Sequence, residues 1–277
     1  MTVETTPIST AIGVEVRGLS SADFQSAEVA AECQRLLAAH GVVVYRDAHI
    51  SDPALVAFSR MLGEVVVAPT GGHPDFPEIS PVTMDPTRSK LAGLRRSTIF
   101  WHTDGLTDVL PQKATLLTAR EIADEGGDTE FANTYAAYEA MPENRKNELD
   151  RYQVVHSVAA SQLLIDPEPT EKQRAAWDLA PTQVHPLVWR RRDGRRSLLI
   201  GATAGQIVGL EPDAGRALLD DLLDWATQPQ FVLRHRWQVG DLVVWDNPGL
   251  LHRATPYAPA SRRLMHRTTL VGEEAIA

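Results

Sequence analysis

Short strand-like segments, each followed by a turn rich in glycine or proline, dominate the second half of this chain and constrain its fold most strongly. Residues 113–121 and 241–247 are apolar enough to be buried strands, and residues 231–238 alternate between apolar and polar side chains. Residues 185–201 have the pattern of a hairpin with an Asp-Gly tip. Further strands are predicted at residues 42–47, 129–133 and 263–272. Such a series favours a β-sandwich or β-barrel.

Helical periodicity is confined to a few stretches beside these strands. They are residues 27–41, residues 52–63, two short helices separated at Pro142, and residues 213–228. In the second stretch, Asp52 is predicted as the N-cap and Pro53 as the first helical residue. The expected fold class is mainly β with flanking helices, and residues 1–277 are expected to form a single domain.

The composition excludes several classes of partner and site. A net charge of -9 in 277 residues argues against a nucleic-acid or anionic-membrane partner. No apolar run approaches the roughly 18 residues of a membrane span. Cys33 is the single cysteine, so neither a disulfide framework nor a thiolate metal site is expected. The polar N-terminus has no secretory pattern, and we therefore expect a cytoplasmic protein.

The segment FWHTDGL, residues 100–106, places His102 and Asp104 two positions apart. In an extended segment such residues project to the same side, so both side chains could reach one metal ion. Iron sites of oxygenases use two histidines and one carboxylate on one face of the metal. An H-x-D pair is nevertheless weak by itself, because it also occurs by chance in surface loops.

His252 is the histidine best placed to complete such a site. It follows a buried strand and an Asp-Asn-Pro-Gly turn, a context that holds a side chain rigidly. A lone histidine there is more often a core residue, but the H-x-D pair and a strand carrying Arg263 and Arg267 favour a site. These two arginines are four residues apart and so share a strand face, which suits recognition of a carboxylate or sulfonate.

At this point the chain resembles a known family. The motifs HGVVVYRD, FWHTDGL, ADEGGDTEFAN, VGDLVVWDNPGLLHRATPY and RRLMHRTTLVG, in this order, look like those of the taurine dioxygenase family. Members are oxygenases that depend on Fe(II), 2-oxoglutarate and O2. The resemblance covers nearly the whole chain and implies a double-stranded β-helix, or jelly roll. It also implies hydroxylation of a substrate C–H bond, with release of succinate and carbon dioxide.

The resemblance assigns roles to individual residues. His102, Asp104 and His252 match the iron ligands, and Thr129 matches the threonine that hydrogen-bonds 2-oxoglutarate. Arg263, eleven residues after His252, matches the arginine that pairs with the distal carboxylate of that co-substrate. Two positions are expected to bind the substrate: Arg267, near its anionic group, and Gly105, which would leave room for it.

The chain departs from the taurine enzymes in the region that would contact the substrate. Val66 and Ala68 stand near the position of a sulfonate-binding histidine, which His73 could replace. We therefore expect a small anionic organic substrate other than taurine: a carboxylate, a sulfonate or a sulfate ester. Active-site loops are expected near residues 65–98 and 157–180, and Leu163 or Trp177 could line the pocket. The family also implies a homo-oligomer, a dimer or a tetramer.

Two other functions are compatible with parts of this pattern. A zinc hydrolase could use two histidines and one carboxylate, although the paired arginines would have no special role in it. A non-catalytic jelly-roll binding protein could keep the same residues for sensing. The combination of the three metal-ligand candidates with Thr129, Arg263 and Arg267 favours the dioxygenase.

Overall fold

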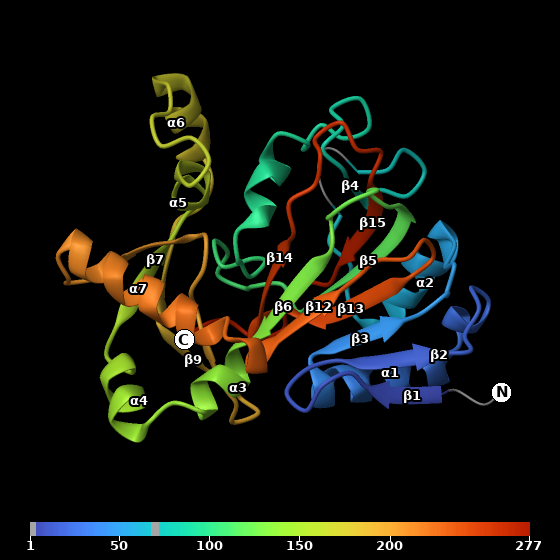
Figure 1. Cartoon of the computed structure of the whole chain (residues 1–277), viewed down its shortest axis with the longest axis horizontal. Coiled ribbons are helices and arrows are strands. Elements are labelled where there is room, and N and C mark those ends of the chain that lie inside the picture. Colours follow the sequence, from blue (N-terminus) through green and yellow to red (C-terminus); the bar gives the residue numbers. More distant parts are fainter. Residues whose placement is uncertain (1–3, 68–71) are drawn as a thin grey trace.

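The structure, a computed structural model, describes residues 4–67 and 72–277 and consists mainly of strands (Figure 1). The strands are β1 (Glu4–Pro7), β2 (Val14–Arg17), β3 (Val42–Tyr45), β4 (Ser80–Val82), β5 (Ala114–Glu121), β6 (Thr129–Asn133), β7 (Gln153–His156), β8 (Gln183–Pro186), β9 (Val188–Arg190), β10 (Arg196–Leu198), β11 (Ala204–Ile207), β12 (Val232–His235), β13 (Leu242–Asp246), β14 (Leu250–Ala254) and β15 (Leu264–Thr269). The α-helices are α1 (Ala27–His40), α2 (Asp52–Leu62), α3 (Thr134–Glu139), α4 (Glu143–Leu149), α5 (Val158–Leu163), α6 (Glu171–Trp177) and α7 (Pro212–Ala226). Four 3-10 helices complete the fold: η1 (Asp23–Gln25), η2 (Leu94–Ile99), η3 (Pro229–Phe231) and η4 (Asn247–Gly249).

Two sheets enclose a narrow apolar core at the centre of the protein. The larger has seven strands in the order β1-β2-β3-β13-β5-β15-β4, and the smaller has the order β12-β6-β14. Apolar side chains of both meet between them, among them Leu117 and Met265 from the larger sheet and Phe131 from the smaller. Consecutive strands of the chain alternate between the sheets, as β12, β13, β14 and β15 do, which is the arrangement of a jelly roll.

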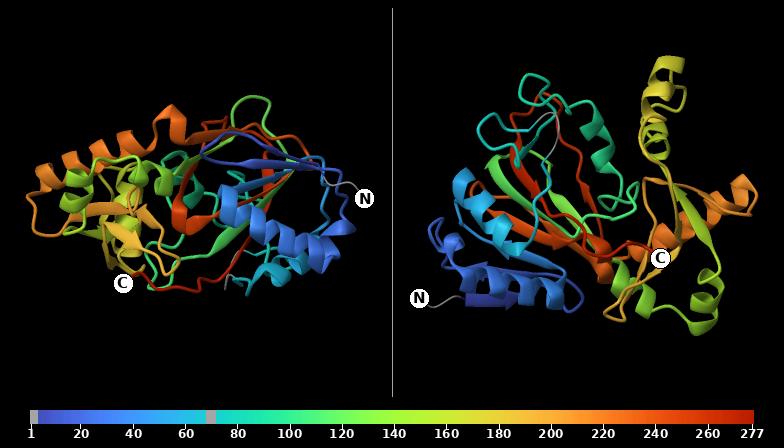
Figure 2. Two further views of the ribbon diagram at one scale, coloured as in Figure 1. Left: turned by 90° about the horizontal axis from the view of Figure 1, so that it is seen from below. Right: turned by 180° about the vertical axis from the view of Figure 1, so that it is seen from behind.

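Helices α1 and α2 cover the outer face of the larger sheet (Figures 1 and 2). The apolar face of α2 packs with β3 and β13 in a core that includes Phe58 and Val244. The predicted N-cap of α2 was wrong by one residue. Ser51 caps the helix and its hydroxyl accepts from Ala54 N, whereas Asp52 is the first helical residue. Asp52 instead binds Arg120 and His266, both on the sheet below.

A second group of elements lies beside the two sheets and has its own apolar core. It includes α3, α4, α7 and the strands β7 to β11, with Trp189 and Leu222 fully buried. From this group α5 and α6 project as an arm, visible in Figure 1 and in the right panel of Figure 2. The helices predicted at 27–41, 52–63, 134–152 and 213–228 are confirmed, as are the hairpin at 185–201 and the strands predicted at 42–47, 113–121, 129–133, 231–238, 241–247 and 263–272. Strands β1, β2, β4, β7, β8, β11 and β14 were not predicted.

None of the helices within the two described ranges combines the length and the apolar character that a membrane span needs.

Candidate metal centre

Backbone pairing brings His102 and His252 directly opposite each other. His102 lies in the segment after η2, and His252 lies on β14 of the smaller sheet. His102 N donates to His252 O at 3.0 Å, and His252 N donates to His102 O at 2.8 Å, which forms an isolated antiparallel bridge. Opposed residues of an antiparallel pair project to the same side. The two imidazole rings consequently lie 4.2 Å apart, centroid to centroid.

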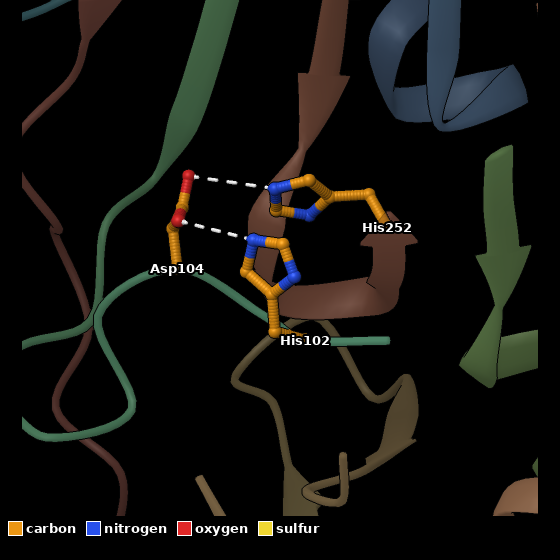
Figure 3. Close-up of side chains that lie close together, drawn as sticks. All are labelled: His102, Asp104 and His252. Atoms are coloured by element: carbon orange, nitrogen blue, oxygen red, sulfur yellow. Dashed lines mark ion pairs between the residues drawn. The ribbon is translucent and has the colours of Figure 1, made fainter. Parts of the chain in front are cut away.

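The Asp104 carboxylate faces both rings (Figure 3). Its Oδ1 lies 4.0 Å from His102 Nε2, and its Oδ2 lies 3.7 Å from His252 Nε2. One ligand atom from each residue fits within 4.8 Å of the other two. These distances exceed hydrogen-bonding range. The three side chains therefore direct lone pairs at a common space without filling it, as the ligands of a metal ion would.

The protonation of the triad suits a metal. His102 Nδ1 lies 2.8 Å from the Phe100 carbonyl, which only accepts, so Nδ1 carries the proton and Nε2 is left with a lone pair. Burial lowers the pKa of His102, and it lowers that of His252 to about 3, so both rings are neutral near pH 7. Burial opposes ionisation of Asp104, but the nearby cations, Arg267 first, hold its pKa well below the usual range. Two neutral imidazoles and one carboxylate are the donor set that Fe(II) takes in such oxygenases.

Thr129 lies in the smaller sheet, on the same face as His252. In the pairing of β6 with β14, Phe131 lies opposite His252 and Thr129 lies opposite Ala254. Alternate residues of a strand share a face, so the Thr129 hydroxyl points to the side of the triad. Trp237 Nε1 donates to Thr129 Oγ1 at 2.9 Å. Because an indole N–H only donates, the hydroxyl proton of Thr129 remains available for a ligand.

Arg263 immediately precedes β15 and is buried. Its Nε donates to the Gly127 carbonyl at 3.1 Å, and its guanidinium lies 5.1 Å from the centre of the Tyr257 ring. A Cβ on Gly127 would approach the Arg263 side chain to 3.0 Å, so glycine makes room for it. Burial lowers the pKa of Arg263. The side chain is thus fixed in one place, as an arginine that pairs with a buried carboxylate must be.

Arg267 lies on β15 and faces the triad. Its Nη1 is 3.4 Å from Asp104 Oδ2, and its Nε is buried and has no hydrogen-bond partner among the described residues. Met265 shares this face of the strand and lies in the core between the sheets. His266 points the other way, to Asp52 of α2 at 2.7 Å. The Arg267 guanidinium therefore lies beside the candidate metal position with unused donor capacity.

Arg95 is a third cationic residue of this region, and the sequence did not reveal it. It lies on η2, and its Nη2 donates to Ser80 Oγ at 3.0 Å. Its charge contributes to the low pKa of Asp104, although less than that of Arg267 does. Because Ser80 belongs to β4, the position of Arg95 depends on a sheet contact that no local pattern encodes.

A family model described as "Taurine catabolism dioxygenase TauD, TfdA family" matches residues 4–269. The chain belongs to this family. A 2,4-dichlorophenoxyacetate dioxygenase of Cupriavidus pinatubonensis, named as alpha-ketoglutarate-dependent, is 33% identical, and the match covers 96% of each chain. An alpha-ketoglutarate-dependent sulfate ester dioxygenase of Pseudomonas putida is 31% identical, over 96% of this chain and 89% of its own.

Solved structures agree with this membership. The crystal structure of AAD-2 with Mn(II) and N-oxalylglycine matches with a TM-score of 0.83 at 28% identity, over 100% of both chains. The expected jelly roll and the taurine dioxygenase family are thus confirmed. So are the enzyme class, a 2-oxoglutarate-dependent dioxygenase, and its requirement for Fe(II), 2-oxoglutarate and O2.

Two expectations about the substrate region of this family member need correction. A Cβ on Gly105 would lie 2.7 Å from Gln112 N, and the residue has a φ of +85°, so backbone packing rather than pocket space explains the glycine. His73 packs against His266, on the face of β15 opposite to Arg267, and so does not replace a sulfonate-binding histidine there. Ala68 lies outside the described residues.

The loops predicted to surround the active site of this dioxygenase contain short helices. Residues 65–98 include β4 and most of η2, and residues 157–180 include α5 and α6. Gln162 on α5 donates to Ser97 on η2 at 3.3 Å, so the two regions meet. An apolar hollow of about 440 Å³ opens between them, lined by residues that include Met84, Ile99, Ile165 and Tyr257.

A larger hollow of about 1090 Å³ lies elsewhere in this family member. It is lined by Leu163 together with outward-facing side chains of the smaller sheet, such as Glu130 and Arg253, and contains none of the triad. Leu163 therefore borders the larger hollow and not the smaller one, which is also lined by none of the triad. Trp177 is buried and borders neither hollow. Tyr257, which lines the smaller hollow, is in contact with Arg263.

Proposed function

We propose that this dioxygenase hydroxylates a C–H bond of a small organic anion whose charged group lies beside Arg267. In this proposal His102, Asp104 and His252 bind Fe(II), and Thr129 and Arg263 bind 2-oxoglutarate. The arrangement that carries the proposal is the triad, with its three ligand atoms within 4.8 Å of one another. Bound iron would supply the redox chemistry, in which O2 is consumed, 2-oxoglutarate becomes succinate and carbon dioxide, and the substrate C–H becomes C–OH, with one oxygen atom of O2 in the succinate and the other in the new hydroxyl group.

Thr129 and Arg263 are proposed to bind different parts of 2-oxoglutarate. The Thr129 hydroxyl, which accepts from Trp237, donates its proton to a carboxylate oxygen of 2-oxoglutarate. The Arg263 guanidinium, held by Gly127 and Tyr257, pairs with the distal carboxylate. Both side chains are buried. Neither hydrogen bond therefore competes with bulk water, and the co-substrate is held in one orientation.

The substrate is proposed to be an anion with an apolar body. Arg267 has a buried Nε without an acceptor, which an oxyanion of the substrate would supply. The hollow next to the site is lined by Met84, Ile99 and Ile165, which suit an alkyl or aromatic group better than an amine. The relatives named above act on a phenoxyacetate and on sulfate esters. We therefore favour an aromatic or alkyl carboxylate, sulfonate or sulfate ester over taurine.

An anaerobic titration tests this function. Fe(II) and 2-oxoglutarate are added to the full chain, and the metal-to-ligand charge-transfer band is recorded while a series of organic anions is added. We expect a band with the wild type, loss of the band in His252→Ala, and a change of the band with those anions that are substrates. Failure of the wild type to form any band would contradict the proposal.

The relatives do not favour the zinc hydrolase, which makes the opposite prediction about oxygen. It would act without O2 and 2-oxoglutarate, and substitution of Arg263 would leave its rate unchanged. Succinate formation that requires Fe(II), O2 and the organic anion would exclude it. A non-catalytic binding protein would form no succinate under any of these conditions.

We further propose one domain over residues 1–277 and a homo-oligomer, a dimer or a tetramer, as expected from the family. A cytoplasmic location and the lack of nucleic-acid or membrane partners remain predictions from the composition. Size-exclusion chromatography with light scattering measures the oligomeric state, and a monomer at micromolar concentration would contradict that part.

A further inference from the structure

We propose that Arg95 is a second guanidinium of the substrate's anion-binding subsite and acts together with Arg267 as a specificity-determining residue. The inference rests on the proposed function, because it places the substrate's charged group between these two side chains. It adds a residue of η2 to a subsite that the sequence assigned to β15 alone.

The sheet register places Arg95 next to Arg267. In the pairing of β15 with β4, Arg267 lies opposite Ser80. Side chains of opposed residues project to the same side, with Cβ atoms about 5 Å apart. The Ser80 hydroxyl accepts from Arg95 Nη2 at 3.0 Å. Ser80 thus anchors the Arg95 guanidinium on the face of the sheet from which Arg267 reaches Asp104 at 3.4 Å.

Both guanidiniums have unused donors. Arg95 Nε and Arg267 Nε are buried, and neither has a hydrogen-bond partner among the described residues. A buried N–H without an acceptor is unfavourable, so two in one place indicate a missing ligand that accepts hydrogen bonds. Two cations held together also repel each other. Burial and the charge of Arg267 together lower the pKa of Arg95 to about 9.

The protein itself supplies little compensating charge. Asp104 is the one carboxylate within 4.0 Å of Arg267 in the described part of the chain, and Arg95 donates its side-chain hydrogen bond to a neutral hydroxyl. Asp104 is also a candidate metal ligand, so a bound ion would take up its charge. An oxyanion with at least two acceptor oxygens would satisfy both Nε donors at once and relieve the repulsion.

Equilibrium binding to the full chain, loaded anaerobically with Fe(II) and 2-oxoglutarate, tests the role of Arg95. The probes are 2,4-dichlorophenoxyacetate and hexyl sulfate, each with a neutral counterpart, 2,4-dichlorophenoxyethanol and hexanol. We expect Arg95→Gln to weaken the better-binding anion about 10- to 100-fold. The affinities for the neutral probes and for 2-oxoglutarate should change less than about twofold, and Arg95→Lys should restore part of the loss.

Two further variants separate a specific contact from general effects. Ser80→Ala keeps both charges but removes the anchor of Arg95, and we expect a weakening of a few-fold for anions only. Lys90→Gln removes a charge from an exposed residue five positions before Arg95 that lines neither hollow. Equal weakening in Lys90→Gln and Arg95→Gln would indicate a diffuse field and overturn the inference. Anion affinity unchanged in Arg95→Gln, or a wild type that prefers the neutral probes, would also overturn it.

The outcome separates this inference from the proposed function. A wild type that binds neither Fe(II) nor 2-oxoglutarate contradicts the function itself. A wild type that binds both, together with an Arg95→Gln variant that binds the anions normally, contradicts only the role of Arg95. Because Arg95→Gln could also unfold the protein, its thermal unfolding and its 2-oxoglutarate affinity are measured in parallel.

Discussion

Two histidine–aspartate clusters among the described residues differ in how the aspartate is satisfied. In the first, Asp104 faces His102 and His252 at 4.0 and 3.7 Å. In the second, Asp241 lies 3.2 Å from His235 and 2.6 Å from Arg46 Nη1. Both carboxyl groups have a lowered pKa, and all three histidines are held neutral by burial. Charge and residue type therefore do not distinguish the clusters.

Hydrogen bonding distinguishes them. Asp241 accepts from Arg46 and from the backbone of Gln238 at 2.9 Å, and it is fully buried. Asp104 has only long contacts, to Thr115 Oγ1 at 3.3 Å and to Arg267 at 3.4 Å. In the second cluster the Asp241 carboxylate is satisfied by short hydrogen bonds, so this cluster serves the fold. In the first cluster the ligand atoms of Asp104, His102 and His252 converge with no donor between them, which is the state of a site that needs an ion.

The largest expected effect is the loss of metal binding when a residue of the first cluster, but not of the second, is replaced. His252→Ala should lower succinate formation by at least on the order of 10³-fold, because the ion loses one of three protein ligands. His235→Ala, the matched change in the second cluster, should bind Fe(II) normally per folded molecule. Metal content and succinate formation are measured on both variants. Normal metal content in His252→Ala would contradict the assignment of the two clusters.

The loss of stability on removing the aspartate should be larger in the second cluster than in the first. Asp241→Ala removes a fully buried carboxylate that accepts from Arg46 and from Gln238 N, and it leaves Arg46 with Glu15 as its remaining partner. The free energy of unfolding should fall by about 2 kcal/mol. Asp104→Ala removes a carboxylate that has no short hydrogen bond, so a change below about 1 kcal/mol is expected without metal. Urea unfolding of both variants in the presence of a chelator measures the difference. Equal losses would show that Asp104 is also a structural residue.

Acid should destabilise the metal-free protein through its buried histidines. The pKa values of His156 and His252 are lowered to about 3, whereas an unfolded histidine titrates near 6.5. Below pH about 6.5 the unfolded chain thus binds protons that the folded chain does not. Each such histidine then costs about 1.4 kcal/mol of stability per pH unit as the pH falls. The free energy of unfolding, measured from pH 7 to pH 5, should therefore decrease.

The variant His252→Gln provides the control for this slope. It removes one of the groups with a lowered pKa, so its stability should fall less steeply with decreasing pH than that of the wild type. An unchanged or steeper slope would mean that His252 is protonated in the folded protein.

The smallest expected effect concerns Trp237, which connects the two regions. Its ring lies 4.4 Å from the His235 ring, and its Nε1 donates to Thr129. Trp237→Phe removes the donor that orients the Thr129 hydroxyl, and we expect the KM for 2-oxoglutarate to rise about fivefold, as for one lost hydrogen bond. The KM for the organic anion should stay the same. A rise in both constants would indicate general damage to the fold instead.

The candidate metal ligands could be predicted from the sequence for a local reason. His102 and Asp104 are two residues apart, and the strand-turn context of His252 is continuous in the chain. Arg263 and Arg267 follow the same logic, since residues four apart on a strand share a face. The helices and most strands were predictable because apolar periodicity reflects which face is buried. In each case the necessary information lies within one element.

The predictions that were wrong concern residues whose surroundings are formed by other parts of the chain. Gly105 was taken as a source of pocket space, but its environment is the backbone of Pro111 and Gln112, which return against it after a turn. His73 was a candidate for the anion site, but its ring packs against His266, which points away from Arg267 on β15. The exposed strand β1 has no apolar alternation, so its pairing with β2 was not visible in the sequence.

The sequence by itself therefore determined the reaction type, because the chemistry of iron and 2-oxoglutarate requires particular side chains in a particular order along the chain. Only the tertiary structure decided which charged residues lie together around them. Arg95 comes next to Arg267 because β4 pairs with β15 and Ser80 holds the guanidinium there. Such long-range register follows from packing of the whole sheet, and it is this packing that shapes the site for the substrate's anionic group.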